Sequence, residues 1–235
     1  IYDDTKQLGL NLLEGTRFKV FGEYNQQFEN PELNLLVLGF DARNYQRIHR
    51  QFIWANRIAG STNFGTRRLI YFMGGTDSWM FPKFDQETRI DPNYNWAYQT
   101  LATNMRGFNQ NARNGNNFLL FNTEFRMPVF RYLLNKPIKS ELVKNFQLVA
   151  FGDVGTAWTG WNPWDKDNVL YNRFVYNGSM RIQVQYEKDP IIAGIGLGAR
   201  TKLLGYFLKA DLAWPVEDGE IKKNPRFYLS MSLDF

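Results

Sequence analysis

The stretch FLLFNTEFRM, residues 118–127, decides the fold class of this chain. Its apolar side chains recur at every second position, and polar side chains fill most of the positions between them. Leu119 and Phe121 fall on one face of an extended strand, whereas Glu124 and Arg126 fall on the other. A period of two predicts a β-strand with one apolar face and one polar face.

The same alternation recurs along the whole chain, and helical periodicity is scarce. Ten strands are predicted, at residues 6–13, 16–26, 33–45, 50–60, 67–75, 117–128, 146–156, 191–203, 205–215 and 225–235. Most are about ten residues long, as in tilted membrane-spanning strands, whereas strands of soluble sheets usually have about five or six. Long polar connections at 76–116, 157–190 and 216–224 contrast with a tight turn at 203–205, as is typical of outer-membrane barrels.

The composition excludes several classes of site. The 235-residue chain has no cysteine and one histidine, His49, in a predicted turn. Disulfide frameworks, cysteine nucleophiles and metal sites built from several cysteines or histidines are therefore excluded. The net charge is +5, but the basic residues are interspersed with acidic ones instead of forming a stripe, so we expect no nucleic-acid partner. We also expect no enzymatic activity, no catalytic residues, no cofactor and no metal.

The hydropathy of the chain is compatible with a membrane protein that crosses by strands. Its mean hydropathy is −0.44, a value that alternating strands give even when their apolar faces contact lipid. No stretch reaches ~18 apolar residues, and no signal peptide opens the chain. Several tryptophans lie near strand ends, as an interfacial aromatic girdle requires. We therefore expect a membrane β-barrel, present as a mature or truncated chain.

The alternative is a soluble β-sandwich or lipocalin-like barrel, in which the same alternation separates a core from water. Two features favour the membrane barrel. Charged residues such as Lys19 and Asp211 lie in the middle of strands, on the polar faces. The opposite faces stay large and apolar up to Phe235, which is in phase with the apolar face of the predicted last strand.

Three short motifs carry the functional prediction: MRGF, which contains Arg106, NTEFRMP, which contains Glu124, and VAFGDVGTAW, which contains Asp153. The alternation places both carboxylates inside the barrel, because a charge facing lipid costs a few kcal/mol near the midplane. A buried guanidinium needs carboxylates to offset its desolvation and binds them in fork geometry. We expect Arg106 to pin the long loop inside the barrel. Pairing of Asp153 with Arg126 or Arg200 is the alternative.

A glycine-rich strand follows these motifs. Gly194, Gly196 and Gly198 alternate within a predicted strand, and no helix follows them, which argues against a phosphate-binding loop. Glycines in a strand allow another part of the chain to approach closely, and we expect the inserted loop to do so here.

These motifs resemble the BamA-like family of outer-membrane assembly and secretion barrels, or bacterial surface antigens, and most closely its Bacteroidetes-type members. In that family an Arg-Gly-Phe/Tyr tip on the sixth extracellular loop inserts into the barrel and meets acidic residues of the following strands. Here Arg106, Gly107 and Phe108 match the tip, and Glu124 and Asp153 match the acidic positions. We call these five residues the loop lock.

The resemblance implies an all-β fold, the C-terminal part of a sixteen-stranded antiparallel transmembrane β-barrel. It divides the chain into strands before the lock at 1–75, a long loop at 76–116 and the last five strands at 117–235. The ten predicted strands fall short of sixteen, and the family's periplasmic POTRA repeats are missing. We therefore expect a portion of a longer protein; a free-standing ten-stranded barrel is the alternative.

The function implied by the resemblance is insertion or translocation of client polypeptides at the bacterial outer membrane, without catalysis. A seam between the first and last strands would template client strands through backbone hydrogen bonds. One face of the last strand would mark this seam and the C-terminal targeting signal: Phe227, Leu229, Met231, Leu233 and Phe235. The alternative is a structural anchor or assembly subunit that holds a periplasmic domain or partner lipoproteins. In both cases the partners are outer-membrane lipid and other proteins of a larger complex.

Overall fold

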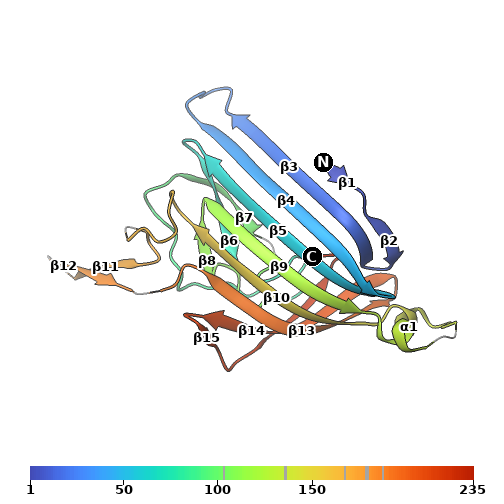
Figure 1. The fold of residues 1–235 in the computed structure, drawn as a ribbon. Coiled ribbons are helices and arrows are strands. Elements are labelled where there is room, and N and C mark those ends of the chain that lie inside the picture. The colour runs from blue at the N-terminus through green and yellow to red at the C-terminus, as the bar shows by residue number, and fades with distance from the viewer. Residues whose placement is uncertain (103, 135–136, 167, 178–179, 187) are drawn as a thin grey trace.

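The computed structural model describes residues 1–102, 104–134, 137–166, 168–177, 180–186 and 188–235. Its main element is an eleven-stranded antiparallel sheet, whose longest strands form a row of slanting arrows in Figure 1. The order is β1 (Tyr2–Asp3), β3 (Leu12–Gln26), β4 (Asn34–His49), β5 (Phe52–Phe64), β9 (Asn117–Met127), β10 (Gln147–Trp158), β13 (Ile192–Leu203), β14 (Tyr206–Glu217) and β15 (Glu220–Ile221). In addition, β2 (Lys6–Gly9) pairs with β3, and β16 (Arg226–Met231) pairs with β14.

The all-β, antiparallel fold class predicted from the alternation is confirmed. The sheet is open, because its two ends do not pair with each other within the described residues. The register explains why alternation was a reliable guide: β9 pairs with β5 on one side and with β10 on the other, so its inward positions align with inward positions of both neighbours, as Asn122 does with Arg57 and Asp153.

The segment between β5 and β9 leaves the main sheet. There β6 (Arg68–Met73) pairs in parallel with β7 (Trp96–Ala102) and antiparallel with β8 (Arg113–Gly115). The prediction that residues 67–75 form a strand of the main sheet is therefore wrong, and the loop before β9 spans 65–116. From Leu69 to Met73 every residue of β6 is buried, because β6 also contacts β5, β9 and β10. An unbroken apolar run is typical of a strand covered on both faces.

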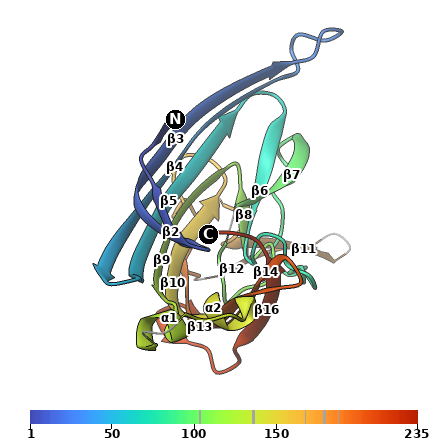
Figure 2. The ribbon, with the colours of Figure 1, turned by 90° about the vertical axis from the view of Figure 1, so that its right-hand side faces the viewer.

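The loop at 65–116 packs on one face of the main sheet, which we call the inner face. Its apolar side chains join those of the strands beneath in one buried cluster: Leu35, Val37, Leu69, Tyr71, Met73, Ala102, Met105, Phe108, Ala112, Leu120, Ala157 and Ile192. Figure 2 shows β6, β7 and β8 on one side of the long strands. The loop is therefore an integral part of the fold.

The opposite face, which we call the outer face, exposes apolar side chains along the whole sheet. They are Phe18, Val20, Leu36, Leu38, Ile58, Leu119, Phe121, Phe125, Leu148, Val154, Ile195, Leu197, Leu212, Phe227 and Met231. On the inner face, the alternate positions of the same strands include charged residues that are almost completely buried, among them Glu124, Asp153 and Arg200. The polarity of the sheet is thus inverted relative to that of a soluble protein.

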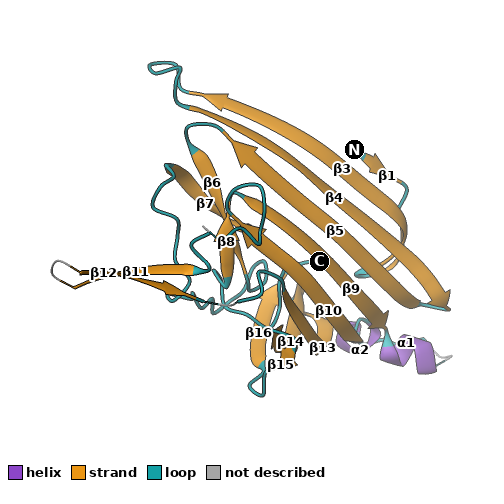
Figure 3. Cartoon of the chain, turned by 60° about the vertical axis from the view of Figure 1, so that its left-hand side comes forward, coloured by secondary structure: helices purple, strands orange, loops and turns teal. Residues whose placement is uncertain are grey.

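Two short helices and a hairpin lie at the margins of the sheet. The helices α1 (Val129–Leu133) and α2 (Glu141–Lys144) connect β9 to β10, and Figure 3 shows them beyond the end of β9. The hairpin of β11 (Asn172–Asn177) and β12 (Met180–Gln185) projects from the connection between β10 and β13. In the parts of the chain that the structure describes, no helix has the length and apolar character needed to cross a membrane.

The end of the chain departs from the predicted last strand. The strand β16 stops at Met231, and Asp234 adopts a φ of 65°, in the left-handed region. Phe235 consequently turns toward the inner face, where it is 5% exposed and packs against Leu12 and Tyr45. The prediction that Phe235 shares the apolar face of Phe227 is therefore wrong, because the left-handed turn breaks the alternation.

Candidate functional site

Backbone hydrogen bonds within the loop at 65–116 fix the position of its tip. Met105 forms an antiparallel bridge with Gly75, with backbone hydrogen bonds of 3.0 Å and 2.9 Å in the two directions. The next residue is Arg106, whose guanidinium enters the layer between the loop and the sheet. Gly107 follows with a φ of 102°, a conformation that side chains with a Cβ rarely adopt. This backbone conformation explains why the Arg-Gly-Phe motif has a glycine at its second position.

The structure brings Arg106 to both predicted carboxylates. Asp153 accepts hydrogen bonds from the Nε (2.7 Å), the Nη2 (2.8 Å) and the backbone N–H (3.1 Å) of Arg106. Glu124 accepts one from the Nη1 (2.7 Å). The guanidinium carbon also lies 3.5 Å from the ring centroid of Phe151, within cation–π range. Arg106 is 2% exposed, so these contacts replace its hydration almost completely.

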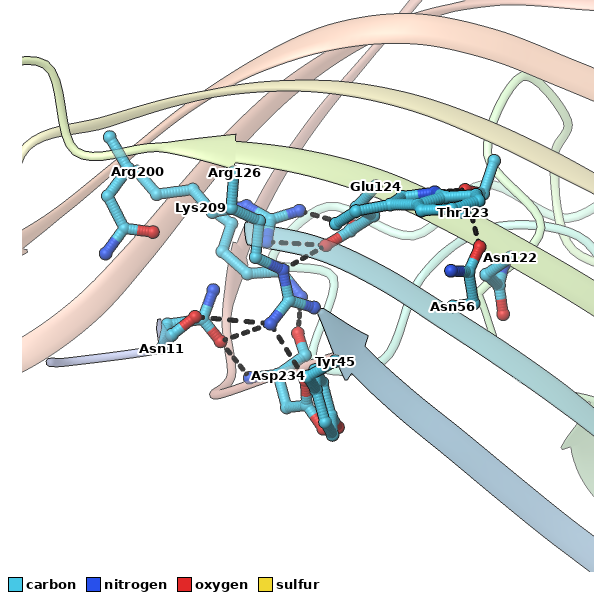
Figure 4. A network of polar contacts seen from close by, with 12 residues as sticks. Asn11, Tyr45, Asn56, Asn122, Thr123, Glu124, Arg126, Arg200, Lys209 and Asp234 are labelled. Carbon is cyan, nitrogen blue, oxygen red and sulfur yellow. Dashed lines mark hydrogen bonds and ion pairs between the residues drawn. The ribbon is translucent and has the colours of Figure 1, made fainter. Parts of the chain in front are cut away.

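Glu124 is the centre of a second set of contacts that sequence reasoning did not assign. Its carboxylate accepts hydrogen bonds from the Nε of Arg126 (2.8 Å) and from two nitrogens of Arg200 (2.9 Å and 2.6 Å). Figure 4 shows Arg126 between Glu124 and the turn at Asp234. Because Arg126 and Arg200 bind Glu124, the alternative in which they serve as the partners of Asp153 is not what the structure shows.

Tyr228 of β16 holds the remaining two residues of the lock motif. Its hydroxyl accepts a hydrogen bond from the N–H of Gly107 (2.9 Å) and donates one to the carbonyl oxygen of Phe108 (2.9 Å). The Phe108 side chain is buried in the apolar cluster on the inner face. Tyr228 was not predicted as a site residue, although its polar hydroxyl at an inward position of the last strand is a signal for one.

The glycine-rich strand β13 receives the loop at one of its three glycines. A Cβ on Gly194 would overlap the carbonyl oxygen of Arg106, so the loop backbone needs the space that this glycine leaves. A Cβ on Gly196 would overlap the carbonyl oxygen of Leu212 and the ring of Phe151, and one on Gly198 would overlap the carboxylate of Asp211. The predicted close approach of the loop therefore applies to Gly194, whereas the other two make room for atoms of the neighbouring strands.

Residues 232–235 make a further contact region with the inner face. The Asp234 carboxylate forms ion pairs with Arg43 (2.7 Å) and Arg126 (3.0 Å) and accepts a hydrogen bond from the Tyr45 hydroxyl. Its backbone oxygen accepts one from the Nζ of Lys209 (2.8 Å). No alternation pattern identifies Asp234, because it lies in a turn after the strand.

The five predicted seam residues do not all lie on one face of the sheet. Phe227, Leu229 and Met231 lie on the outer side of β16, opposite Leu212, Ala210 and Leu208 of β14. Leu233 is exposed beyond the end of the strand, and Phe235 is buried on the inner side.

No family model matches this sequence, and no curated protein matches it. The chemistry of the site is therefore the guide to its role. The guanidinium of Arg106 and the carboxylates of Glu124 and Asp153 are bound to one another, with their hydration removed. Such an arrangement suits a clamp that holds the loop against β9 and β10.

Proposed function

We propose that this chain is part of an outer-membrane β-barrel of the BamA-like family, which assists the insertion or translocation of polypeptides at that membrane. One observation carries the proposal: the outer face exposes apolar side chains on every long strand, while charges are buried on the inner face. Soluble monomers rarely expose contiguous apolar patches of more than a few hundred Å². A bilayer covers such a face and leaves the charges inside.

The open edges of the sheet support a larger barrel. Most of β3 beyond Phe18 has no neighbour on its free side among the described residues, since β1 pairs only with Arg17 and Phe18. In lipid each unpaired backbone group costs several kcal/mol, so membrane sheets close on themselves. We propose that further strands, from a longer chain, extend the sheet from the free edge of β3 toward a closed barrel.

The lock geometry supports the family assignment. The resemblance implies that an Arg-Gly-Phe tip inserts beside acidic residues of the following strands, and Arg106 lies within 2.7 Å of both Glu124 and Asp153. The role of the lock in this proposal is to stabilise the barrel and to fix the loop beside the last strands. The proposed polypeptide-handling activity rests on the resemblance to the family, which is an argument by analogy.

Membrane contact of the outer face is tested with tryptophan quenching in lipid vesicles. Trp54 stacks on Phe125 on the outer face, and Trp79 packs against Tyr228 on the inner face. Two variants are prepared, each of which keeps one of these two tryptophans and has the other six tryptophans of the chain replaced by phenylalanine. Brominated phosphatidylcholine should quench the fluorescence of Trp54 strongly and that of Trp79 weakly. Equal quenching of the two tryptophans would contradict the assignment of the faces.

The polypeptide-handling function is tested in the source organism. The intact parent protein is depleted, and the outer-membrane proteome is quantified. A broad fall in other barrels supports the proposal. A fall in one or two surface proteins supports a dedicated exporter or an anchor that holds partner proteins, and an unchanged proteome contradicts a role in assembly.

A further inference from the structure

The strand β16 has one edge on β14 and a second edge that lies at the end of the sheet. Along β14 it makes six residue pairs, from Leu208↔Met231 to Ala213↔Arg226. The second edge is covered by the loop: Trp79 forms an antiparallel bridge with Ser230, and the N–H of Met80 donates a hydrogen bond to the carbonyl oxygen of Leu229 (2.9 Å). A segment from the middle of the chain thus occupies the position of a neighbouring strand.

The side chains of this segment continue the alternation of the sheet. Trp79 points to the inner side, where its ring centroid lies 4.8 Å from that of Tyr228 and packs against the cluster containing Val149 and Phe151. The next side chain, Met80, is 43% exposed. One inward aromatic followed by one exposed apolar residue is the pattern of an added strand.

The same loop tip that carries Arg106 positions this segment. The N–H of Asp77 donates a hydrogen bond to the Oδ1 of Asn104 (2.8 Å), two residues before Arg106. Ser78 then adopts a φ of 53°, which turns the chain toward β16. The pairing with β16 is therefore coupled to the docking of the loop.

We propose that residues 78–81, which we call the edge guard, act as an intramolecular strand that keeps other extended polypeptides off the free edge of β16. An uncovered edge strand is a template for pairing with another chain. The guard is short, with one bridge and one backbone hydrogen bond, so a partner strand that pairs along the whole of β16 can displace it. The partner's identity as a polypeptide handled by the barrel rests on the proposed function; the guard's contact with β16 does not.

The contact is tested by cysteine cross-linking, for which the chain offers a cysteine-free background. Directly opposed residues of antiparallel strands have Cα atoms about 4.5 to 5.5 Å apart, which a disulfide spans. The pair Trp79→Cys and Ser230→Cys should therefore form a disulfide in most molecules under mild oxidation. The matched control is Trp79→Cys with Leu229→Cys, whose side chain faces the other side of β16. Equal or absent cross-linking in the two pairs would overturn the proposal.

The guarding role is tested with the oxidised and reduced forms of the first cysteine pair in detergent. The probe is a fluorescent peptide with the sequence YFLKADLAW of residues 206–214, because this part of β14 already pairs with β16. Its affinity should be at least tenfold higher for the reduced form than for the oxidised form, and a scrambled peptide should show no difference. Equal affinities would overturn the proposal.

A proline variant gives an independent measure of the guard. Met80→Pro removes the N–H that binds Leu229, while Met80→Ala retains it. The proline variant should bind the peptide more tightly than the alanine variant, and equal binding by both would count against the guard. Because this assay needs neither vesicles nor the organism, its failure is distinguishable from failure of the proposed function.

Discussion

Replacing Arg106 by methionine tests whether the loop lock stabilises the fold. Asp153 receives three hydrogen bonds from Arg106, and the guanidinium and the carboxylate are both almost completely buried. After the substitution, Asp153 keeps the backbone N–H of residue 106 and the amide of Asn122, which lies at 2.7 Å. Its charge then has no cation within ion-pair distance among the described residues.

The expected loss of stability follows from the burial of the ion pair between Arg106 and Asp153. Removing one partner of a buried ion pair costs about 3 to 5 kcal/mol, because the other charge stays desolvated. For a chain of this size, each kcal/mol lowers the unfolding midpoint by roughly 2 to 4 °C. We therefore expect Arg106→Met to lower the midpoint by roughly 6 to 20 °C. The exposed Arg67, at the start of the same loop, is the matched control, and Arg67→Met should change the midpoint little.

A double-mutant cycle separates the two carboxylates. Arg106 donates three hydrogen bonds to Asp153 but one to Glu124, which also binds Arg126 and Arg200. The coupling energy of Arg106→Met with Asp153→Asn should thus exceed that with Glu124→Gln, by about 1 to 2 kcal/mol.

The assay is the temperature at which the folded form loses its faster gel mobility, measured in detergent for each variant. An Arg106→Met midpoint equal to that of the Arg67→Met control would refute the buried clamp. A larger coupling with Glu124 than with Asp153 would refute the assignment of Asp153 as the principal partner.

Three further substitutions test other parts of the site by the same thermal assay or by proteolysis. Gly194→Ala places a Cβ on the carbonyl oxygen of Arg106 and should destabilise by about 1 to 3 kcal/mol, whereas Gly152→Ala, which meets only ordinary contacts, should be tolerated. Tyr228→Phe removes both hydrogen bonds to the loop tip and should cost about 1 to 3 kcal/mol, with faster proteolysis of the loop. Asp234→Asn weakens two ion pairs and should make the last four residues more accessible to carboxypeptidase, while heat resistance falls less than in Arg106→Met.

Most long strands of the main sheet were predictable because they have one covered face and one exposed face. The predicted break between 6–13 and 16–26 was wrong, because β3 runs unbroken from Leu12 to Gln26 and most of it is exposed on both faces. In β9 the inward Glu124 and Arg126 alternate with exposed Phe121 and Phe125, so a period of two is visible in the sequence. The strand β6 was assigned to the wrong sheet because both of its faces are covered, which removes the alternation that carries the information. The strands β7 (WAYQTLA) and β8 (RNG) lie within 76–116, which was predicted to be a long polar connection, and tertiary contacts decide their pairing with β6.

The contacts of Arg106 with Glu124 and Asp153 were predictable because both carboxylates occupy inward positions of their strands, and a buried guanidinium needs such partners. Arg126 and Arg200 occupy inward positions of the same alternation, and a buried glutamate surrounded by inward arginines was deducible from phase alone. Their register across the sheet was not deducible, since it depends on which strands become neighbours. Phe235 was placed on the wrong face for a related reason: a single left-handed residue, Asp234, reverses the phase.

The loop is better understood as a structural part of the sheet than as a movable plug. Within the described residues, Arg106 is the one cation within 4.0 Å of Asp153 and Asp211, which are 0% and 1% exposed. Withdrawal of the loop would leave two carboxylates of β10 and β14 without an ion-pair partner in a largely dehydrated layer, at a cost of several kcal/mol. The contact between the edge guard and β16 is far smaller, with one backbone hydrogen bond. If the proposed barrel opens to another polypeptide, we expect the opening at the edge of β16, where the contact is weakest, while Arg106 stays bound.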